Sequence, residues 1–332
     1  MLSKFKTFSI FAFLSVSPAL VAGESLFTYK GKAYTKEQMT IKQQFRLFDL
    51  ENHIYNGKKN LIEDAILDMH IEEVAKKSGK SAAEARKKVL AVKDPTDADL
   101  KKFYEENKSK IPYPFEKVKG EVARFVKQKA AQEQRGKVLA ELKKKGTYKI
   151  SFKGPVSPEV KINTKNFARR GKANSKVTVV EFADYKCPHC REASLAFKKL
   201  YKKYDSKVNF VFIDFPISHG ISTTIAAGAY CAGKQGKYWE YHTMAFDQQK
   251  SLNANSHNAF AEKLGLDLTK FKKCGSSKEG AKVVSAGKKE GERVGVSGTP
   301  TIFINGRKVT KGYDFETMSQ EIDAALSGRK SS

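Results

Sequence analysis

Cys187-Pro188-His189-Cys190 decides the fold of this chain, because it stands between a strand-like run, Val177-Thr178-Val179-Val180-Glu181-Phe182, and a helical pattern from Arg191 to Tyr204. Apolar and polar residues alternate in the first segment, as they do in a β-strand. A thiol at the first turn of a helix faces unsatisfied backbone N–H groups and the positive end of the helix dipole, so its pKa falls. The pattern therefore predicts a redox-active dithiol at a strand-to-helix turn.

The two residues between the thiols fit this interpretation. Pro188 suits the first helical turn, where its missing N–H has no partner to lose. His189 can bring a hydrogen-bond donor or a positive charge toward the Cys187 sulfur, which favours the thiolate. A stabilised thiolate stabilises the reduced pair, so the disulfide becomes oxidising.

Three other roles compete for such a motif. A structural disulfide between residues three apart would remove almost no chain entropy. A zinc site needs two more ligands, whereas the other cysteines, Cys231 and Cys274, are single and far apart. Haem attachment requires His directly after the second cysteine, and Arg191 occupies that position. The redox role is therefore the favoured one.

Residues 1–23 resemble a secretory signal peptide. Lys4 and Lys6 precede an apolar run from Phe8 to Ser17, which is too short to span a bilayer, and small residues follow it. No later segment is apolar enough for a membrane helix. We expect cleavage after Ala22 or Gly23 and a soluble protein in an oxidising compartment, most simply a bacterial periplasm.

The chain is strongly basic, with 62 Lys and Arg against 36 Asp and Glu and a formal net charge of +26. The positive residues are scattered over polar helix faces and do not form a stripe with interleaved aromatic residues. This distribution favours solvated faces over nucleic-acid binding. We therefore expect no nucleic-acid partner.

The 332 residues have room for two domains after the signal peptide. Residues 24–153 are predicted to form an all-α domain, because apolar residues recur there at helical spacing between proline breaks. Residues 154–173 have little periodicity and are predicted to be a linker. Residues 174–330 read as strand, helix, strand, with a helical insertion at about 218–296, which is typical of an α/β thioredoxin-like fold.

The helical half resembles the chaperone domain that precedes the prolyl-isomerase modules of SurA-type periplasmic proteins. The match rests on residues 94–107 and 114–118, on the long helix that follows, and on a short strand at Tyr148-Lys149-Ile150. The resemblance implies a client-binding domain. A spacer or a dimerisation arm remains an open alternative.

The C-terminal half resembles DsbA-type thiol oxidoreductases over about residues 174–328. The resemblance rests on the dithiol motif, on Gln235-Gly236-Lys237-Tyr238-Trp239-Glu240 inside the insertion, and on Gly295-Val296-Ser297-Gly298-Thr299-Pro300-Thr301. It implies that Cys187 is the exposed thiol that substrate attacks and that Cys190 is the leaving and resolving partner.

The same resemblance implies roles for two further positions. Thr299-Pro300 would form the loop opposite the dithiol, with a cis proline beside which an extended substrate segment can pair. Glu181 matches a buried acid on the incoming strand, which could move protons to and from Cys190. The alternative for Glu181 is a side chain that points to solvent, since strand faces alternate.

Cys231 and Cys274 both lie inside the predicted insertion. We interpret them as a structural disulfide, which would stabilise the fold by up to about 4 kcal/mol on a chain-entropy basis. A second redox centre is the alternative, but neither cysteine has a CxxC partner or a clear helix-start position.

These observations predict an enzyme that introduces disulfides into secreted proteins by thiol–disulfide exchange at Cys187 and Cys190. The alternatives are an isomerase or reductase that acts as an oligomer, and a periplasmic holdase chaperone with a secondary redox site. The expected partners are reduced or unfolded secreted proteins, a membrane or soluble protein that recycles the dithiol, and a second copy of the chain in a homodimer. We expect no metal and no cofactor other than the redox-active pair itself.

Overall fold

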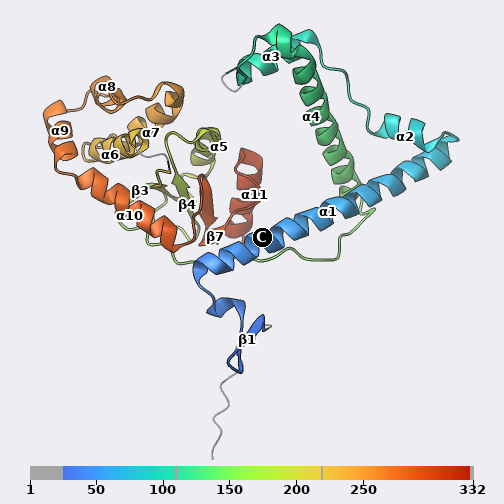
Figure 1. The fold of residues 1–332 in the computed structure, drawn as a ribbon, viewed down its shortest axis with the longest axis horizontal. Coiled ribbons are helices and arrows are strands. Elements are labelled where there is room, and N and C mark those ends of the chain that lie inside the picture. Colours follow the sequence, from blue (N-terminus) through green and yellow to red (C-terminus); the bar gives the residue numbers. More distant parts are fainter. Residues whose placement is uncertain (1–24, 109–110, 218–219, 330–332) are drawn as a thin grey trace, which may run out of the picture. The chain divides into compact units, whose positions relative to one another are not determined.

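The computed structural model describes residues 25–108, 111–217 and 220–329 (Figure 1). The predicted signal peptide lies outside these residues. The chain divides into two compact units. The first holds the residues up to Arg46, Pro158–Lys308 and Tyr313–Phe315, and the second holds Leu47–Ser157, Val309–Gly312 and the residues from Glu316 onward. None of the described helices is long and apolar enough to cross a membrane.

Strands of the first unit form a two-stranded hairpin and, among the described residues, a five-stranded mixed sheet. The hairpin strands are β1 (Phe27–Tyr29) and β2 (Lys32–Tyr34). The sheet strands are β3 (Ala168–Gly171), β4 (Thr178–Ala183), β5 (Asn209–Asp214), β6 (Thr301–Ile304) and β7 (Arg307–Lys308), in the order β3-β5-β4-β6-β7. Only β4 and β5 are parallel, and the other neighbours are antiparallel.

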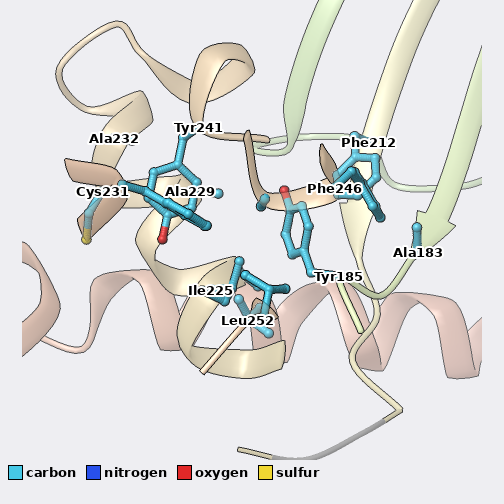
Figure 2. Packing of buried hydrophobic residues seen from close by; sticks show 14 of the residues in the cluster. Ala183, Tyr185, Phe212, Ile225, Ala229, Cys231, Ala232, Tyr241, Phe246 and Leu252 are labelled. Carbon is cyan, nitrogen blue, oxygen red and sulfur yellow. The ribbon is translucent and has the colours of Figure 1, made fainter. Parts of the chain in front are cut away.

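The active-site helix α5 (Pro188–Tyr204) follows β4 directly. Between β5 and β6 the chain forms α6 (Ile221–Gly233), α7 (Tyr238–Asp247), a 3-10 turn η2 (Gln249–Ser251), α8 (Ser256–Lys263), α9 (Leu268–Ser276) and α10 (Glu279–Arg293). These helices make up the predicted insertion and bury an apolar cluster around Tyr185, Tyr241 and Phe246 (Figure 2). The predicted fold class, a thioredoxin-like α/β fold with a helical insertion, is confirmed.

The second unit is helical. Its elements are α1 (Ile41–Ser78, from residue 47 onward), α2 (Ala82–Val89), α3 (Asp97–Asn107), α4 (Phe115–Lys144) and α11 (Phe315–Leu326, from residue 316 onward). Capping boxes open α2 at Ser81 and α3 at Thr96. One small core joins α1, α2 and α4, and a second joins α3 to α4. Helix α1 is continuous from Ile41 to Ser78 (Figure 1).

The unit boundaries differ from the predicted domains at both ends. Residues 25–46 belong to the first unit, where Phe45 is buried and its ring lies 6.0 Å from that of Phe303. Residues from Glu316 onward, predicted to be part of the C-terminal domain, group with the helical unit. Helical periodicity shows that Phe45 lies on a buried face, but it does not show which unit covers that face.

The predicted linker and the predicted strand at residues 148–150 also differ from the structure. Strand β3 lies inside the linker range 154–173 and pairs antiparallel with β5, so the sheet begins before residue 174. The strand sequence Ala-Arg-Arg-Gly lacks apolar alternation, and its place at the edge of the sheet does not require any. Tyr148–Ile150 forms no strand.

Candidate functional site

The dithiol lies where β4 turns into α5. Cys187 has an extended backbone, with φ −74° and ψ 119°, and is the N-cap residue of α5, while Pro188 occupies the first helical turn. The N–H of Cys187 donates to the carbonyl of Asp184 at 3.1 Å, and the Cys187 carbonyl accepts from the N–H of Arg191 at 3.2 Å. These bonds hold the first sulfur at the positive end of the helix.

Two buried polar side chains that the sequence analysis did not select fix this loop. The Asp184 carboxylate accepts hydrogen bonds from the N–H of Lys186 at 2.6 Å, from the N–H of Ile217 at 2.8 Å and from the Ser222 hydroxyl at 2.5 Å. The Gln249 amide donates to the carbonyl of Cys187 at 2.8 Å. Asp184 directly follows β4 and stands three residues before Cys187, so its position in the sequence could have suggested a role in this loop. Nothing in the sequence connects Gln249 to Cys187, which is 62 residues away.

Cys187 is less accessible than predicted. Both thiols are unbonded to each other in this structure, and Cys187 is only 8 % exposed as a residue. The expectation of an exposed thiol is therefore wrong for this state of the chain. The flanking loop around Thr299 covers the sulfur, because the Cys187 Sγ lies 3.2 Å from the Thr299 carbonyl oxygen.

The surroundings of Cys187 lower the pKa of its thiol to about 5. The main cause is a hydrogen bond from the Cys190 thiol, and burial opposes it. The Thr299 side chain and the backbone N–H groups of Cys190 and His189 add to the lowering. At neutral pH, Cys187 is thus a thiolate when the pair is reduced.

Cys190 behaves in the opposite way. It is fully buried, and burial followed by its hydrogen bond to Cys187 raises the pKa of its thiol far above the ordinary value. The N–H of Asp184 approaches its sulfur at 3.5 Å. The pair is therefore asymmetric, with an ionised outer sulfur and a protonated inner one.

His189 does not act on the Cys187 sulfur as the sequence analysis expected. Its imidazole is 65 % exposed, and its Nδ1 lies 3.0 Å from the Tyr313 hydroxyl and 3.4 Å from a Glu192 carboxylate oxygen. Its contribution to the low pKa of Cys187 comes from its backbone N–H. A motif fixes the position of a side chain along the helix, but the neighbouring residues determine where that side chain points.

Thr299 and Pro300 lie opposite the dithiol, and the peptide bond between them is cis. The Thr299 carbonyl faces Cys187, as described above. The Thr299 hydroxyl is buried and has no partner in hydrogen-bonding geometry among the described residues. It is nevertheless close enough to both sulfurs to lower the pKa of each.

Glu181 lies in the middle of β4, paired with Phe212 on one side and Ile302 on the other. It is 3 % exposed, and burial raises the pKa of its carboxyl to about 8. Val179, two residues earlier on the same face of β4, lies opposite Phe210 of β5, and the Phe210 ring contacts Phe197 and Tyr201 of α5. Glu181 therefore lies on the face of the sheet that α5 covers. The side chain therefore does not point to solvent.

Cys231 of α6 and Cys274 of α9 are joined by a disulfide, with their Cα atoms 5.8 Å apart. Cys231 is buried in the apolar cluster of the insertion. Figure 2 shows Cys231 beside Ala232 in this cluster, with Tyr241 close by. The bridge connects two helices of the insertion across 43 positions in the sequence.

A thioredoxin family model matches residues 163–324. The probable disulfide bond formation protein D of Bacillus cereus is 31 % identical over 168 residues, which is 47 % of this chain and 77 % of that protein. The chain belongs to the DsbA-type thiol:disulfide oxidoreductases of the thioredoxin fold. The N-terminal helical part lies outside the region that the family model matches.

Other similar proteins carry a different name. The Na(+)/H(+) antiporter NhaA 1 of Salinispora arenicola is 32 % identical over 163 residues, and the chain spans 25 % of its length. Solved structures that resemble the chain include oxidised BdbD from Bacillus subtilis, with a TM-score of 0.47 and 23 % identity over 52 % of this chain and 100 % of that chain. Another is α-DsbA2 from Wolbachia pipientis, with a TM-score of 0.45 and 22 % identity over 48 % of this chain and 88 % of that chain.

Proposed function

We propose that this protein introduces disulfides into client proteins outside the cytoplasm. The observation that carries the proposal is the opposite displacement of the two thiol pKa values, with that of Cys187 lowered to about 5 and that of Cys190 raised. A low pKa makes Cys187 a good leaving group, and a protonated Cys190 is a poor nucleophile.

The exchange proceeds in two steps. A client thiolate attacks Cys187 Sγ of the oxidised pair, a client–Cys187 disulfide forms, and the Cys190 sulfur leaves and takes up a proton. The second client thiolate then attacks the client sulfur of this mixed disulfide and expels Cys187 as a thiolate. The client loses two electrons and gains its disulfide, while the protein pair becomes a dithiol. Because Cys190 is protonated and buried, its return attack on Cys187 is slow, so release of the oxidised client is favoured.

The test is oxidation of a reduced dithiol peptide by the oxidised chain, together with the equilibrium of the pair with glutathione. We expect stoichiometric transfer of the disulfide to the peptide and an oxidising potential. Cys187→Ser should abolish transfer, while the double variant Cys231→Ala, Cys274→Ala serves as a control that keeps it. A pair that stays oxidised in reduced glutathione would contradict the proposal and would favour a reductase.

We also propose that Glu181 supplies the proton that Cys190 needs when it leaves. A carboxyl with a pKa of about 8 is protonated at neutral pH and lies under α5, which carries Cys190. Glu181→Gln keeps the shape but cannot exchange a proton, so it should slow peptide oxidation and remove its pH dependence near 8. Equal slowing at every pH would instead indicate a structural effect.

Thr299 and Pro300 are the proposed client-binding positions. The Thr299 carbonyl oxygen lies 3.2 Å from the Cys187 sulfur, so a client segment whose sulfur bonds to Cys187 would lie beside this loop and could pair with its backbone. Placement outside the cytoplasm is supported by the second disulfide, since such bridges persist in oxidising compartments. The recycling partner would bind the same face in the reduced state.

A second candidate function belongs to the helical unit. Four large apolar side chains of α1 are more than half exposed and lie within one arc of the helix: Leu50, Ile54, Leu61 and Met69. Such a stripe suits either an unfolded client or a second copy of the chain. Leu61→Glu with Met69→Glu tests both, because a client-binding role predicts slower oxidation of a large unfolded protein with unchanged peptide oxidation. A dimerisation role predicts a halved molar mass in light scattering.

A further inference from the structure

A cavity of about 310 Å³ lies in the first unit beside the active-site helix, between α5, α7 and strand β3. Its size is at the lower end of small-molecule sites, which begin at about 300 Å³, so it suits a compact ligand. The residues that line it are Arg170, Ser194, Lys198, Tyr201, Lys202, His242, Thr243 and Phe246. Among the described residues, no carboxylate lines this cavity.

Arg170 of β3 is held in an unusual setting for a guanidinium group. It stacks 4.3 Å from the ring centre of Tyr201 and 5.2 Å from that of Trp239. Its Nε is buried, and no described residue lies in hydrogen-bonding geometry with it. Two aromatic faces thus fix the plane of the group while its Nε–H donor has no partner among the described residues.

Two lysines of α5 bring further positive charge to the same cavity. Lys198 lies 2.6 Å from Asp247, which offsets its charge. Lys202 is exposed and lines the same cavity. Two positive charges, those of Arg170 and Lys202, therefore meet at a cavity that no carboxylate of the described residues lines, which favours an anion or solvent between them.

The positive charges at the cavity also act on the pKa of the buried His242 imidazole. Burial is the first cause that lowers its pKa to about 3, and the charges of Arg170 and Lys198 lower it further. Thr243 also lines the cavity, and the Ser194 hydroxyl donates to the carbonyl of Arg191. The imidazole is neutral, so it adds no positive charge of its own.

We propose that this cavity binds a compact tetrahedral oxyanion of the phosphate class, with Arg170 and Lys202 as its principal ligands. The guanidinium offers parallel N–H donors to two oxygens, and an ammonium group offers a mobile point charge to a third. A tetrahedral anion accepts from these separate directions, whereas a single carboxylate takes up only one edge of the guanidinium. The site is independent of the redox chemistry proposed above.

Calorimetric titration of the reduced chain with inorganic phosphate, at an ionic strength held constant with sodium chloride, tests the proposal. We expect saturable binding of one phosphate per chain. Lys202→Gln should weaken the affinity about tenfold, since it removes one charge-assisted contact. Lys199→Gln removes the same charge from the same helix at a residue that does not line the cavity, so it should leave the affinity unchanged. Arg170→Gln should abolish binding.

A parallel titration with glycerol phosphate distinguishes the two possible ligands. Tighter binding of glycerol phosphate than of inorganic phosphate identifies a phosphate monoester as the ligand, and weaker binding identifies free phosphate. A second readout follows imidazole resonances by NMR, where phosphate should shift the signal of His242 and leave that of His257 in place. Absence of saturable binding overturns the proposal. Equal weakening by Lys199→Gln and Lys202→Gln also overturns it, since that result reports only the attraction of a chain with net charge +26.

Discussion

The low pKa of Cys187 predicts that the reduced chain gains stability over the oxidised chain as the pH rises. The thiol has a pKa of about 5 in the folded chain and about 9.0 in the absence of structure. An acid whose pKa is lowered by folding adds its full stabilisation above the unfolded pKa and loses it as the pH falls through the folded pKa. The relevant window is therefore pH 5 to 9.

The size of the effect at pH 7 follows from this window. Between pH 5 and 7 the folded thiol ionises and the unfolded thiol does not, which gives about 2.7 kcal/mol at about 1.36 kcal/mol per pH unit. Partial solvation of the sulfur screens the interaction, so we expect on the order of 2 kcal/mol. For a two-electron couple this raises the reduction potential by about 40 mV.

The assay is urea unfolding of the reduced and oxidised chains at pH 4, 5.5, 7 and 8. Other buried groups also depend on pH, but they act in both forms. The pKa of Glu181 is raised by burial to about 8, so this carboxyl costs stability as the pH rises above 4.5 whatever the state of the dithiol. The difference between the two unfolding free energies removes this contribution.

We expect that difference to be near zero at pH 4 and to favour the reduced chain increasingly up to pH 8. Cys190→Ala should reduce the pH dependence of the unfolding free energy of the reduced chain, because it removes the main hydrogen-bond donor to Cys187. Cys190→Ser should retain part of this pH dependence. A difference that is constant with pH, or a thiolate absorbance midpoint near 9, would refute the reasoning.

Three further outcomes follow from the site. Thr299→Val should raise the pKa of Cys187 by up to about one unit, read from thiolate absorbance, because it removes a hydroxyl near the sulfur without changing the side-chain shape. Asp184→Asn should cost about 2 kcal/mol in urea unfolding, since a buried charged acceptor of three hydrogen bonds is lost. The double variant Cys231→Ala, Cys274→Ala should lower stability by up to about 4 kcal/mol while the absorbance titration of Cys187 stays unchanged.

Local signals predicted the framework of the first unit. Alternation in residues 177–182 and helical spacing in residues 191–204 correspond to β4 and α5, whose observed bounds differ from them by a few residues. The turn at Asn305-Gly306 follows β6, and both residues have positive φ, which these two residue types tolerate. Each of these features depends on a few consecutive residues, so the sequence pattern is sufficient to find it.

Features that depend on distant residues were not predictable in this way. The Gln249 amide, in a turn of the insertion, donates a hydrogen bond to the Cys187 carbonyl. The Tyr313 hydroxyl, in a loop near the end of the chain, lies within hydrogen-bonding distance of the His189 imidazole. Strand β3 is stabilised by pairing with β5 and not by its own composition. In each case the partner is chosen by the tertiary fold, which a local pattern does not contain.

The asymmetry of the dithiol arises from both kinds of information. The strand-to-helix turn places Cys187 at the helix start and Cys190 one turn further in, which is a local consequence of the motif spacing. The depth of Cys190 comes from the cluster packed over it by the insertion helices, which includes Ala229 and Phe246 (Figure 2). Burial keeps the inner thiol protonated, and the protonated thiol is the main donor that stabilises the outer thiolate. The insertion therefore lowers the pKa of Cys187 indirectly, by raising that of Cys190.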